Sequence, residues 1–127
     1  MGSIGGRLSI INSFNSGDIA GNVNLRSTLS NSVGGLVGYL NSSFLEIDTS
    51  YNAGSVSGKS YTGGLIGYAH SALTLTSIYN TGPVSGTDYI GGLIGNARAA
   101  QTISSSYNTG TISNLSVTGT NRTGGLI

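Results

Sequence analysis

Two carboxylates on one short segment, Glu46 and Asp48, are the residues whose types and spacing come closest to catalytic chemistry. The segment reads as a strand, in which alternate side chains share a face, so the two carboxyl groups are expected about 7 Å apart. Paired carboxylates can act as acid and base in glycoside hydrolysis. Other copies of the repeat described below carry Ser, Thr or Ile at the aligned positions and no second acid. The sequence therefore favours an exposed, solvated pair.

No other combination of residues predicts a reactive site. The single histidine, His70, follows Gly67-Tyr68 in a segment that we expect to be a solvated loop, and the chain has no cysteine. No aspartate recurs as it does in calcium-binding solenoids. Gly58-Lys59-Ser60 lacks the glycine that a phosphate-binding loop requires five residues before Gly58, because position 53 is Ala. Polysaccharide-cleaving β-helices need clusters of Asp, Lys and Arg on one face, and this chain is too poor in charge to supply them. We predict no enzymatic activity, no metal and no cofactor.

The composition narrows the classes of partner. Charged residues make up 7% of the 127 residues and the net charge is +1, so there is no basic patch for nucleic acid. No apolar run approaches the ~20 residues that span a bilayer, and the N-terminal residues lack the pattern of a signal peptide. Glycine is frequent (22 residues), but Ile, Val, Leu and Tyr recur at set intervals, which opposes disorder.

Two motifs recur along the chain. The first is Gly-Gly-Leu-Ile/Val-Gly, whose glycine pairs begin at positions 34, 63, 91 and 124. The second has the form Tyr-Asn-x-Gly-x-Val-Ser-Gly, with its aromatic residue at positions 14, 51, 79 and 107. A period of about 28 residues with occasional insertions is typical of stacked repeat units whose extra residues form loops. The predicted organisation is one repeat domain over 1–127, with repeat cores at about 7–33, 34–62, 63–90 and 91–123 and a partial copy at 124–127.

The aligned copies predict columns of equivalent side chains on short strands. Helix caps and a 3.6-residue period are missing, and each frequent glycine would cost a helix about 1 kcal/mol. Stacked units would bury their apolar columns as a continuous core, each strand pairing in parallel with its equivalent. The predicted fold is all-β, a parallel β-solenoid (β-helix) of roughly four coils. The predicted core columns are Phe14, Tyr51, Tyr79 and Tyr107, and Leu36, Leu65, Leu93 and Leu126. The predicted hydrogen-bonded amide ladder is Asn15, Asn52, Asn80 and Asn108.

The aromatic column is assigned to the core by its spacing from a second column. It lies four residues after the aliphatic column Ile10, Ile47, Leu75 and Ile103. An even spacing on one continuous strand places both columns on the same face.

The combination of Gly-Gly-Leu-Ile-Gly with Tyr-Asn-x-Gly-x-Val-Ser-Gly resembles the GLUG-motif repeats of large bacterial surface proteins. The resemblance covers residues 7–127, with departures at Asn96, which replaces a tyrosine, and at Asn114, which replaces a glycine. GLUG repeats occur in adhesin-like chains and beside the peptidase unit of some immunoglobulin-A-cleaving enzymes. The resemblance implies an extracellular or cell-surface location and a structural or adhesive role as a stalk, spacer or interaction module. It carries over no catalytic residue.

A ligand-binding face is the alternative reading. A flat row of Thr, Ser and Asn could bind ice or a glycan, but the row that holds Thr81 and Thr109 continues as Ser16 and Ala53. Tyrosines could stack on the sugar rings of a glycan or host surface, and the candidates for this role are Tyr39, Tyr61, Tyr68 and Tyr89. For each of them, packing against the coil is the favoured role.

Self-association is the expected mode of interaction. The sequence shows no polar capping repeat, and the open end of a solenoid presents unpaired strand edges. Joining Met1 to Ile127 would place Phe14 seventeen residues beyond Gly124, close to the spacing of 16 or 17 residues between these motifs within the chain. Two interpretations stay open: copies that stack head to tail into a filament, and a segment that pairs with neighbouring repeats of a longer chain.

Overall fold

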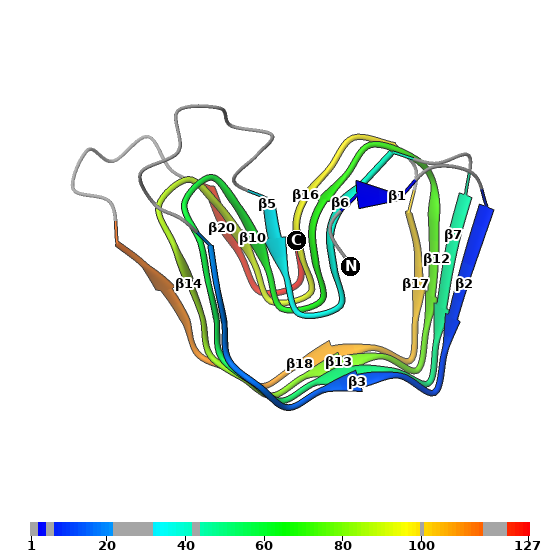
Figure 1. Ribbon diagram of the computed structural model, residues 1–127, viewed down its shortest axis with the longest axis horizontal. Coiled ribbons are helices and arrows are strands. Elements are labelled where there is room, and N and C mark those ends of the chain that lie inside the picture. Colours follow the sequence, from blue (N-terminus) through cyan, green and yellow to red (C-terminus); the bar gives the residue numbers. More distant parts are fainter. Residues whose placement is uncertain (1–2, 5–6, 22–31, 42–43, 100, 116–121) are drawn as a thin grey trace.

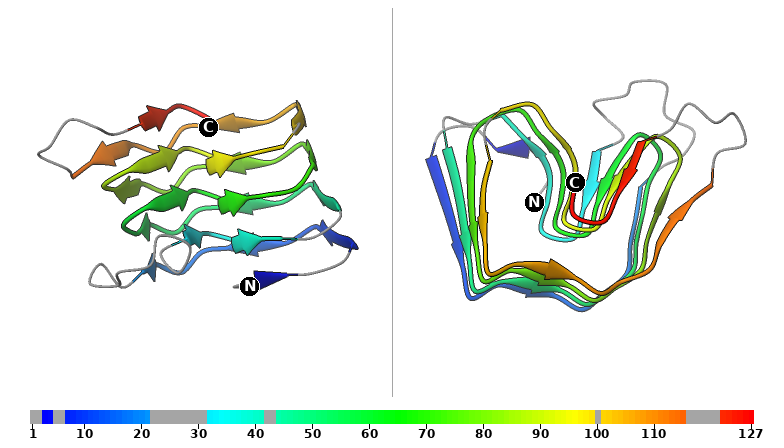
Figure 2. Two further views of the ribbon diagram at one scale, coloured as in Figure 1. Left: turned by 90° about the horizontal axis from the view of Figure 1, so that it is seen from above. Right: turned by 180° about the vertical axis from the view of Figure 1, so that it is seen from behind.

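The protein is a parallel β-solenoid, as the sequence predicted. The computed structural model describes residues 3–4, 7–21, 32–41, 44–99, 101–115 and 122–127. These residues form twenty short strands in five sheets of four strands each, and every pairing between them is parallel. Each full coil contributes one strand to each sheet, and the coils lie on top of one another (Figures 1 and 2).

The sheets are numbered I to V in the order in which the chain meets them within a coil. Sheet I contains β2 (Arg7–Ile11), β7 (Phe44–Asp48), β12 (Leu73–Thr76) and β17 (Gln101–Ser104). Sheet II contains β3 (Phe14–Asn15), β8 (Tyr51–Asn52), β13 (Tyr79–Asn80) and β18 (Tyr107–Asn108). Sheet III contains β4 (Ile19–Ala20), β9 (Val56–Ser57), β14 (Val84–Gly86) and β19 (Ile112–Asn114).

The last two sheets flank the Gly-Gly-Leu motifs. Sheet IV contains β5 (Ser32–Gly34), β10 (Tyr61–Gly63), β15 (Tyr89–Gly91) and β20 (Arg122–Gly124). Sheet V contains β1 (Ser3–Ile4), β6 (Val37–Leu40), β11 (Ile66–Ala69) and β16 (Ile94–Ala97). The register pairs equivalent residues of the repeat, so that Gly63 lies between Gly34 and Gly91.

The corner between sheets I and II depends on one residue per coil with a left-handed backbone. Asn12, Thr49, Ser77 and Ser105 have φ angles of 51°, 48°, 51° and 49°. Such angles are uncommon outside glycine and are best tolerated by short polar residues. In three coils the next residue is a serine whose hydroxyl donates to the carbonyl two residues back, as Ser50 does to Asp48 at 2.8 Å. This bond closes the corner and ends the strand.

The turn between sheets IV and V folds inward and reaches sheet II, so the coil is not a simple ring (Figure 1). An ideal Cβ on Gly64 would lie 2.1 Å from the carbonyl oxygen of Gly92 and 2.5 Å from Cγ of Asn80. Any side chain there would collide with backbone and with a buried amide. The glycine pairs of the motif are therefore required by close approach.

The inward turn divides the interior into two parts. The larger core, between sheets I and V, includes Val37, Leu45, Ile47, Ile66, Leu75 and Ile94, all without exposed surface. The smaller part, between sheets III and IV, contains buried Val33, Val56, Val84 and Ile90. Aliphatic side chains from successive coils line both parts, which gives each coil an apolar contact with the next.

The longer insertions in the repeat fall outside the described residues. The 37-residue offset between β3 and β8 includes residues 22–31, and the 33-residue offset between β15 and β20 includes residues 116–121. The offsets between β8, β13 and β18 are both 28 residues. In the described part of the chain, no helix is long and apolar enough to cross a membrane.

Thr62 provides a test of the smaller core. It has no exposed surface, it lies in register between Val33 and Ile90, and its hydroxyl has no hydrogen-bond partner among the described residues. An unpaired buried hydroxyl costs about 1–3 kcal/mol. We expect Thr62→Val to raise the free energy of unfolding by about 1 kcal/mol in urea denaturation. The control Thr123→Val, at an exposed position of the same column, should give no gain, and a loss of stability in Thr62→Val would contradict this account.

Candidate functional site

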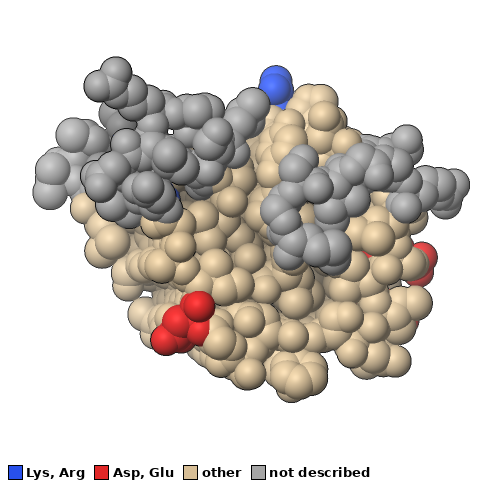
Figure 3. Space-filling model, viewed as in Figure 1, with Lys and Arg blue, Asp and Glu red and all other residues tan. Residues whose placement is uncertain are grey.

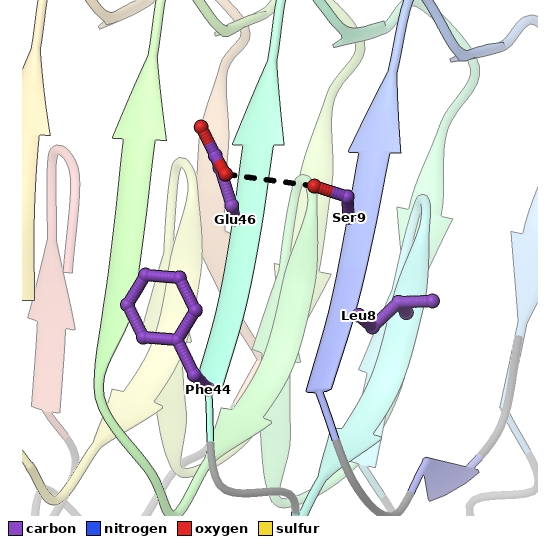
Figure 4. A pocket seen from close by; sticks show the side chains of 4 residues that line it. All are labelled: Leu8, Ser9, Phe44 and Glu46. Carbon is purple, nitrogen blue, oxygen red and sulfur yellow. Dashed lines mark hydrogen bonds between the residues drawn. The ribbon is translucent and has the colours of Figure 1, made fainter.

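The acidic residues with the most suggestive spacing lie on the outer face of sheet I. Glu46 is exposed and lies opposite Ser9 and Thr74, and Ser9 Oγ is 3.5 Å from Glu46 Oε2. Asp48 accepts a hydrogen bond from Thr49 Oγ1 at 3.0 Å. A shallow pocket of about 250 Å³ at this place is lined by Leu8, Ser9, Phe44 and Glu46 (Figure 4). Its lining contains one carboxylate and no second titratable side chain.

The other titratable candidates lie apart from this pair. His70 is exposed after β11, and its backbone N–H donates to the carbonyl of Leu40 at 3.0 Å. Its ring centroid lies 6.3 Å from that of Tyr68. No group of three or more His, Cys, Asp or Glu side chains with the arrangement of a metal site occurs among the described residues.

The predicted asparagine ladder is present inside sheet II and links all four coils. The Nδ2 atoms of Asn15, Asn52 and Asn80 each donate to Oδ1 of the next asparagine along the axis, at 2.8, 2.7 and 2.7 Å. Each of the four Nδ2 atoms also donates to the carbonyl of the glycine two residues later, for example Asn80 to Gly82 at 2.8 Å. Each amide thus fixes a local turn and bonds to its neighbours in the stack.

The ladder is shielded from solvent where it is complete. Asn52 and Asn80 have no exposed surface, whereas Asn15 and Asn108, at the two ends, are half-buried. The second glycine of the Gly-Gly pair packs on the inner amides. In this low-dielectric setting an amide hydrogen bond is stronger, and a missing partner costs more, than at the surface.

The aromatic column lies outside the solenoid, which corrects its assignment to the core. Phe14 is 61% exposed and Tyr107 is 49% exposed, while Tyr51 and Tyr79 are partly exposed. The rings stack face to face, with centroids 5.3, 4.8 and 5.2 Å apart and interplanar angles of 8°, 1° and 5°. The column is a continuous row of stacked rings along the axis, and we call these four residues the aromatic ridge.

The left-handed corner explains the error. Counting four residues from Ile47 to Tyr51 places both side chains on one face only if the strand is continuous. The positive φ at Thr49 turns the chain between them, and after the turn the asparagine points inward while the ring points outward. Thr49, Ser77 and Ser105 give little sign of this conformation in the sequence, and Asn12 is the only residue of the four whose type suggests it.

The leucine column lies at the bottom of the inward turn. Leu65 and Leu93 are fully buried, Leu36 is partly buried against the core, and Leu126 is 39% exposed in the last described coil. The carbonyls of Leu65, Leu93 and Leu126 each accept two N–H groups of the preceding coil, as Leu93 does from Leu65 and Ile66 at 3.0 and 2.9 Å. The column therefore contributes both packing and backbone bonds between coils.

The remaining tyrosines contact one another across the space between sheets IV and V. Ring centroids are 5.3 Å apart for Tyr39 and Tyr68, 4.8 Å for Tyr61 and Tyr68, and 5.0 Å for Tyr61 and Tyr89. Tyr68 is buried and Tyr39, Tyr61 and Tyr89 are partly buried, so these rings pack against one another and do not stand apart as open platforms. A hydrogen bond to the Tyr68 side chain raises the pKa of Arg98.

Asn96 interrupts this tyrosine cluster. It lies in register with Tyr68, where a third stacked ring would follow those of Tyr39 and Tyr68. A pocket of about 230 Å³ is found there, lined by Tyr89, Gly95, Asn96, Ala97 and Ile127.

Asp18 is a second surface carboxylate that bonds from coil to coil, after Glu46 with Ser9. Asp18 Oδ1 accepts hydrogen bonds from Ser55 Oγ at 2.7 Å and from the Ser55 backbone N–H at 3.1 Å. These two bonds, the side-chain bond first, lower the pKa of Asp18 below its ordinary value of 3.8. Asp18 is therefore ionised at neutral pH.

The buried ladder should be more sensitive to mutation in its middle than at its end. Asn80→Ala removes the donor to Gly82 and Asn108 and the acceptor for Asn52. We expect a loss of about 3 kcal/mol in the free energy of unfolding, since each buried unpaired group costs about 1–3 kcal/mol. Asn108→Ala is the matched control and should cost about 1 kcal/mol, because water reaches its partners. An equal or larger loss at Asn108 would show that burial does not set the strength of the ladder.

The Asp18–Ser55 hydrogen bonds predict that the stability of the fold depends on pH. A carboxyl whose pKa is lower in the folded than in the unfolded chain contributes stability above its unfolded pKa and loses it as pH falls through the folded pKa. Stability should therefore decrease on acidification below about pH 4 in part through Asp18. NMR titration should give Asp18 a pKa below 3.8, and Ser55→Ala should raise it, while the neighbouring Ser57→Ala should not. A pKa for Asp18 that Ser55→Ala leaves unchanged would refute the assignment.

Comparisons with known proteins gave no match: no family model, curated protein or solved structure is significantly similar to this chain.

Proposed function

We propose that this chain is a structural or adhesive repeat module of the GLUG type, extracellular or on a bacterial cell surface, that acts by stacking coil on coil. The proposal rests on the resemblance of its two motifs to GLUG repeats. It is supported by the stacked columns, because the features with the most regular geometry recur in every coil and do not converge on one point. The partner is another coil of the same pattern, from a second copy of the chain or from neighbouring repeats of a longer one.

The polarity of the asparagine ladder is the observation that carries this proposal. All three bonds between coils run in one direction, with Nδ2 as donor toward the C-terminal coil. At the C-terminal edge, Asn108 Nδ2 donates to Gly110 alone among the described residues, although an amide has two N–H donors. At the other edge, Asn15 Oδ1 accepts from Gly17 N–H alone among them. A donor at one edge and an acceptor at the other suit head-to-tail stacking.

The aromatic ridge and the sheet edges support the same mode of contact. Ring faces are covered by neighbours in the inner coils, while Phe14 and Tyr107 each lack a neighbour on one side among the described residues. Among the described strands, β2, β3 and β4 at one edge and β17 and β18 at the other have a neighbouring strand on one side only. Unpaired strand edges readily add further strands. A further coil would extend the ladder, the ridge and the sheets together.

Glycan and ice binding have weaker support. A sugar ring stacks on an open aromatic face, and the inner rings of the ridge present their edges instead. The row of Ser16, Ala53, Thr81 and Thr109 is exposed but irregular in residue type. No observation therefore favours either ligand over contact between coils.

The test is the association state of the purified chain. Sedimentation velocity and electron microscopy should reveal species that grow along one axis as concentration rises. Two substitutions at the C-terminal edge should reduce them. Tyr107→Lys places a charge where the next ring would stack, and Ile112→Pro removes an N–H that, by analogy with the Val84 N–H bond to Thr111, faces the open edge.

The matched control is Thr102→Lys, which adds the same charge to the same coil on the exposed side face of sheet I. It should leave the association unchanged. Association that is reduced equally by Thr102→Lys would indicate a lateral contact and not stacking of coils. A chain that stays monomeric at every concentration would refute self-association through the coil edges.

A further inference from the structure

The aromatic ridge has a second property that contact between coils does not use. Because neighbouring rings cover each other's faces, the surface along the ridge consists of ring edges, which repeat at spacings of about 5 Å and carry a phenolic hydroxyl on Tyr51, Tyr79 and Tyr107. The C–H groups of a ring edge and the hydrogen of a phenolic hydroxyl carry partial positive charge and prefer the negative face of another π system, in an edge-to-face contact. A flat aromatic molecule that lies along the axis would meet several such edges at once.

Short side chains leave the flanks of the ridge open. On one side run Asn12, Thr49, Ser77 and Ser105, and on the other run Ser16, Ala53, Thr81 and Thr109; all eight are exposed. The ridge is thus bordered by two parallel strips of small residues. A long, narrow ligand fits this arrangement, while a compact one would contact only one or two rings.

The charges near the ridge select against anions. Asp18 follows Phe14 in the first coil and is ionised at neutral pH, and Asp48 precedes Tyr51 in the second. The strands of sheet II and the two bordering strips contain no Lys or Arg. In the face shown in Figure 3, acidic side chains are seen at the lower left and on the right-hand side, and basic ones only in the upper half.

From these observations we infer that the aromatic ridge is a binding site for elongated, planar aromatic molecules that carry no negative charge. The ligand lies parallel to the solenoid axis beside the ridge, with its π face against the ring edges of Tyr51, Tyr79 and Tyr107. Binding depends on at least three coils in register, and it needs neither an open end nor association of the chain.

The probe is thioflavin T, an elongated planar benzothiazolium cation, titrated by fluorescence at a protein concentration where sedimentation shows a single species. The chain should bind it saturably, and Tyr79→Ser, which removes the central ring, should weaken binding roughly tenfold. Tyr79→Phe keeps the ring and should keep the affinity. The matched control, Tyr39→Ser, removes a stacked tyrosine from the cluster between sheets IV and V and should change the affinity by less than about twofold.

Several results would overturn the inference. These are binding that Tyr79→Ser leaves intact, binding that Tyr39→Ser abolishes, or equal affinity for the compact anion 8-anilinonaphthalene-1-sulfonate. A lateral dimer that Tyr79→Ser dissociates would also overturn it, because a second copy would then occupy the ridge. If circular dichroism shows that Tyr79→Ser is unfolded, Thr81→Lys is the variant to test. It keeps all four rings and covers one of the bordering strips with a long cationic side chain. The affinity for thioflavin T should then fall by a similar factor.

Discussion

The close contact between the inward turn and the asparagine ladder constrains the whole cross-section of the coil. Each inner asparagine bonds to the asparagines above and below and to a local glycine carbonyl, so its position is set both along the axis and within the coil. The Gly-Gly turn rests on these amides so closely that no Cβ can be accommodated at Gly64. With the turn held there, sheets IV and V diverge from it, and the two apolar compartments form on either side. A change in either motif would alter both compartments, which explains why both motifs recur with the same period.

Much of this architecture can be predicted from the sequence because, when coils stack in register, residues that lie one repeat apart in the sequence are neighbours in adjacent coils. The parallel solenoid, the amide ladder and the buried positions of Leu65 and Leu93 follow from aligned copies alone. The inward fold of the Gly-Gly turn cannot be predicted in this way. A glycine indicates that another group can approach the backbone closely, but it does not indicate which group. The contacts of Tyr61 with Tyr68 across the turn depend on that fold and could not be predicted either.

The outward position of the aromatic ridge shows where periodicity arguments fail. Alternation predicts a face only within one strand, and a single left-handed residue resets the alternation without changing the repeat length. Asn12 belongs to a residue type that tolerates this backbone, but in the other coils Thr49, Ser77 and Ser105 adopt it through the context of the corner. The Ser50 hydroxyl bond to Asp48 O stabilises the corner, and the in-register neighbours impose the same turn on every coil.

Repetition also determines what kind of function such a surface can have. A catalytic site needs unlike groups that converge on one point, whereas stacked coils bring like groups together in rows. Within a row, amides hydrogen-bond to one another and rings stack on one another. The last member of each row can make the same contact with a further coil. The side chains of the interior rows find their partners in neighbouring coils. Specificity toward other molecules must therefore come from the solvent-facing sides of the rows that point outward. On the aromatic ridge those sides are ring edges bordered by short side chains along the whole axis and by carboxylates in the first two coils, a combination that selects ligands by length, flatness and charge.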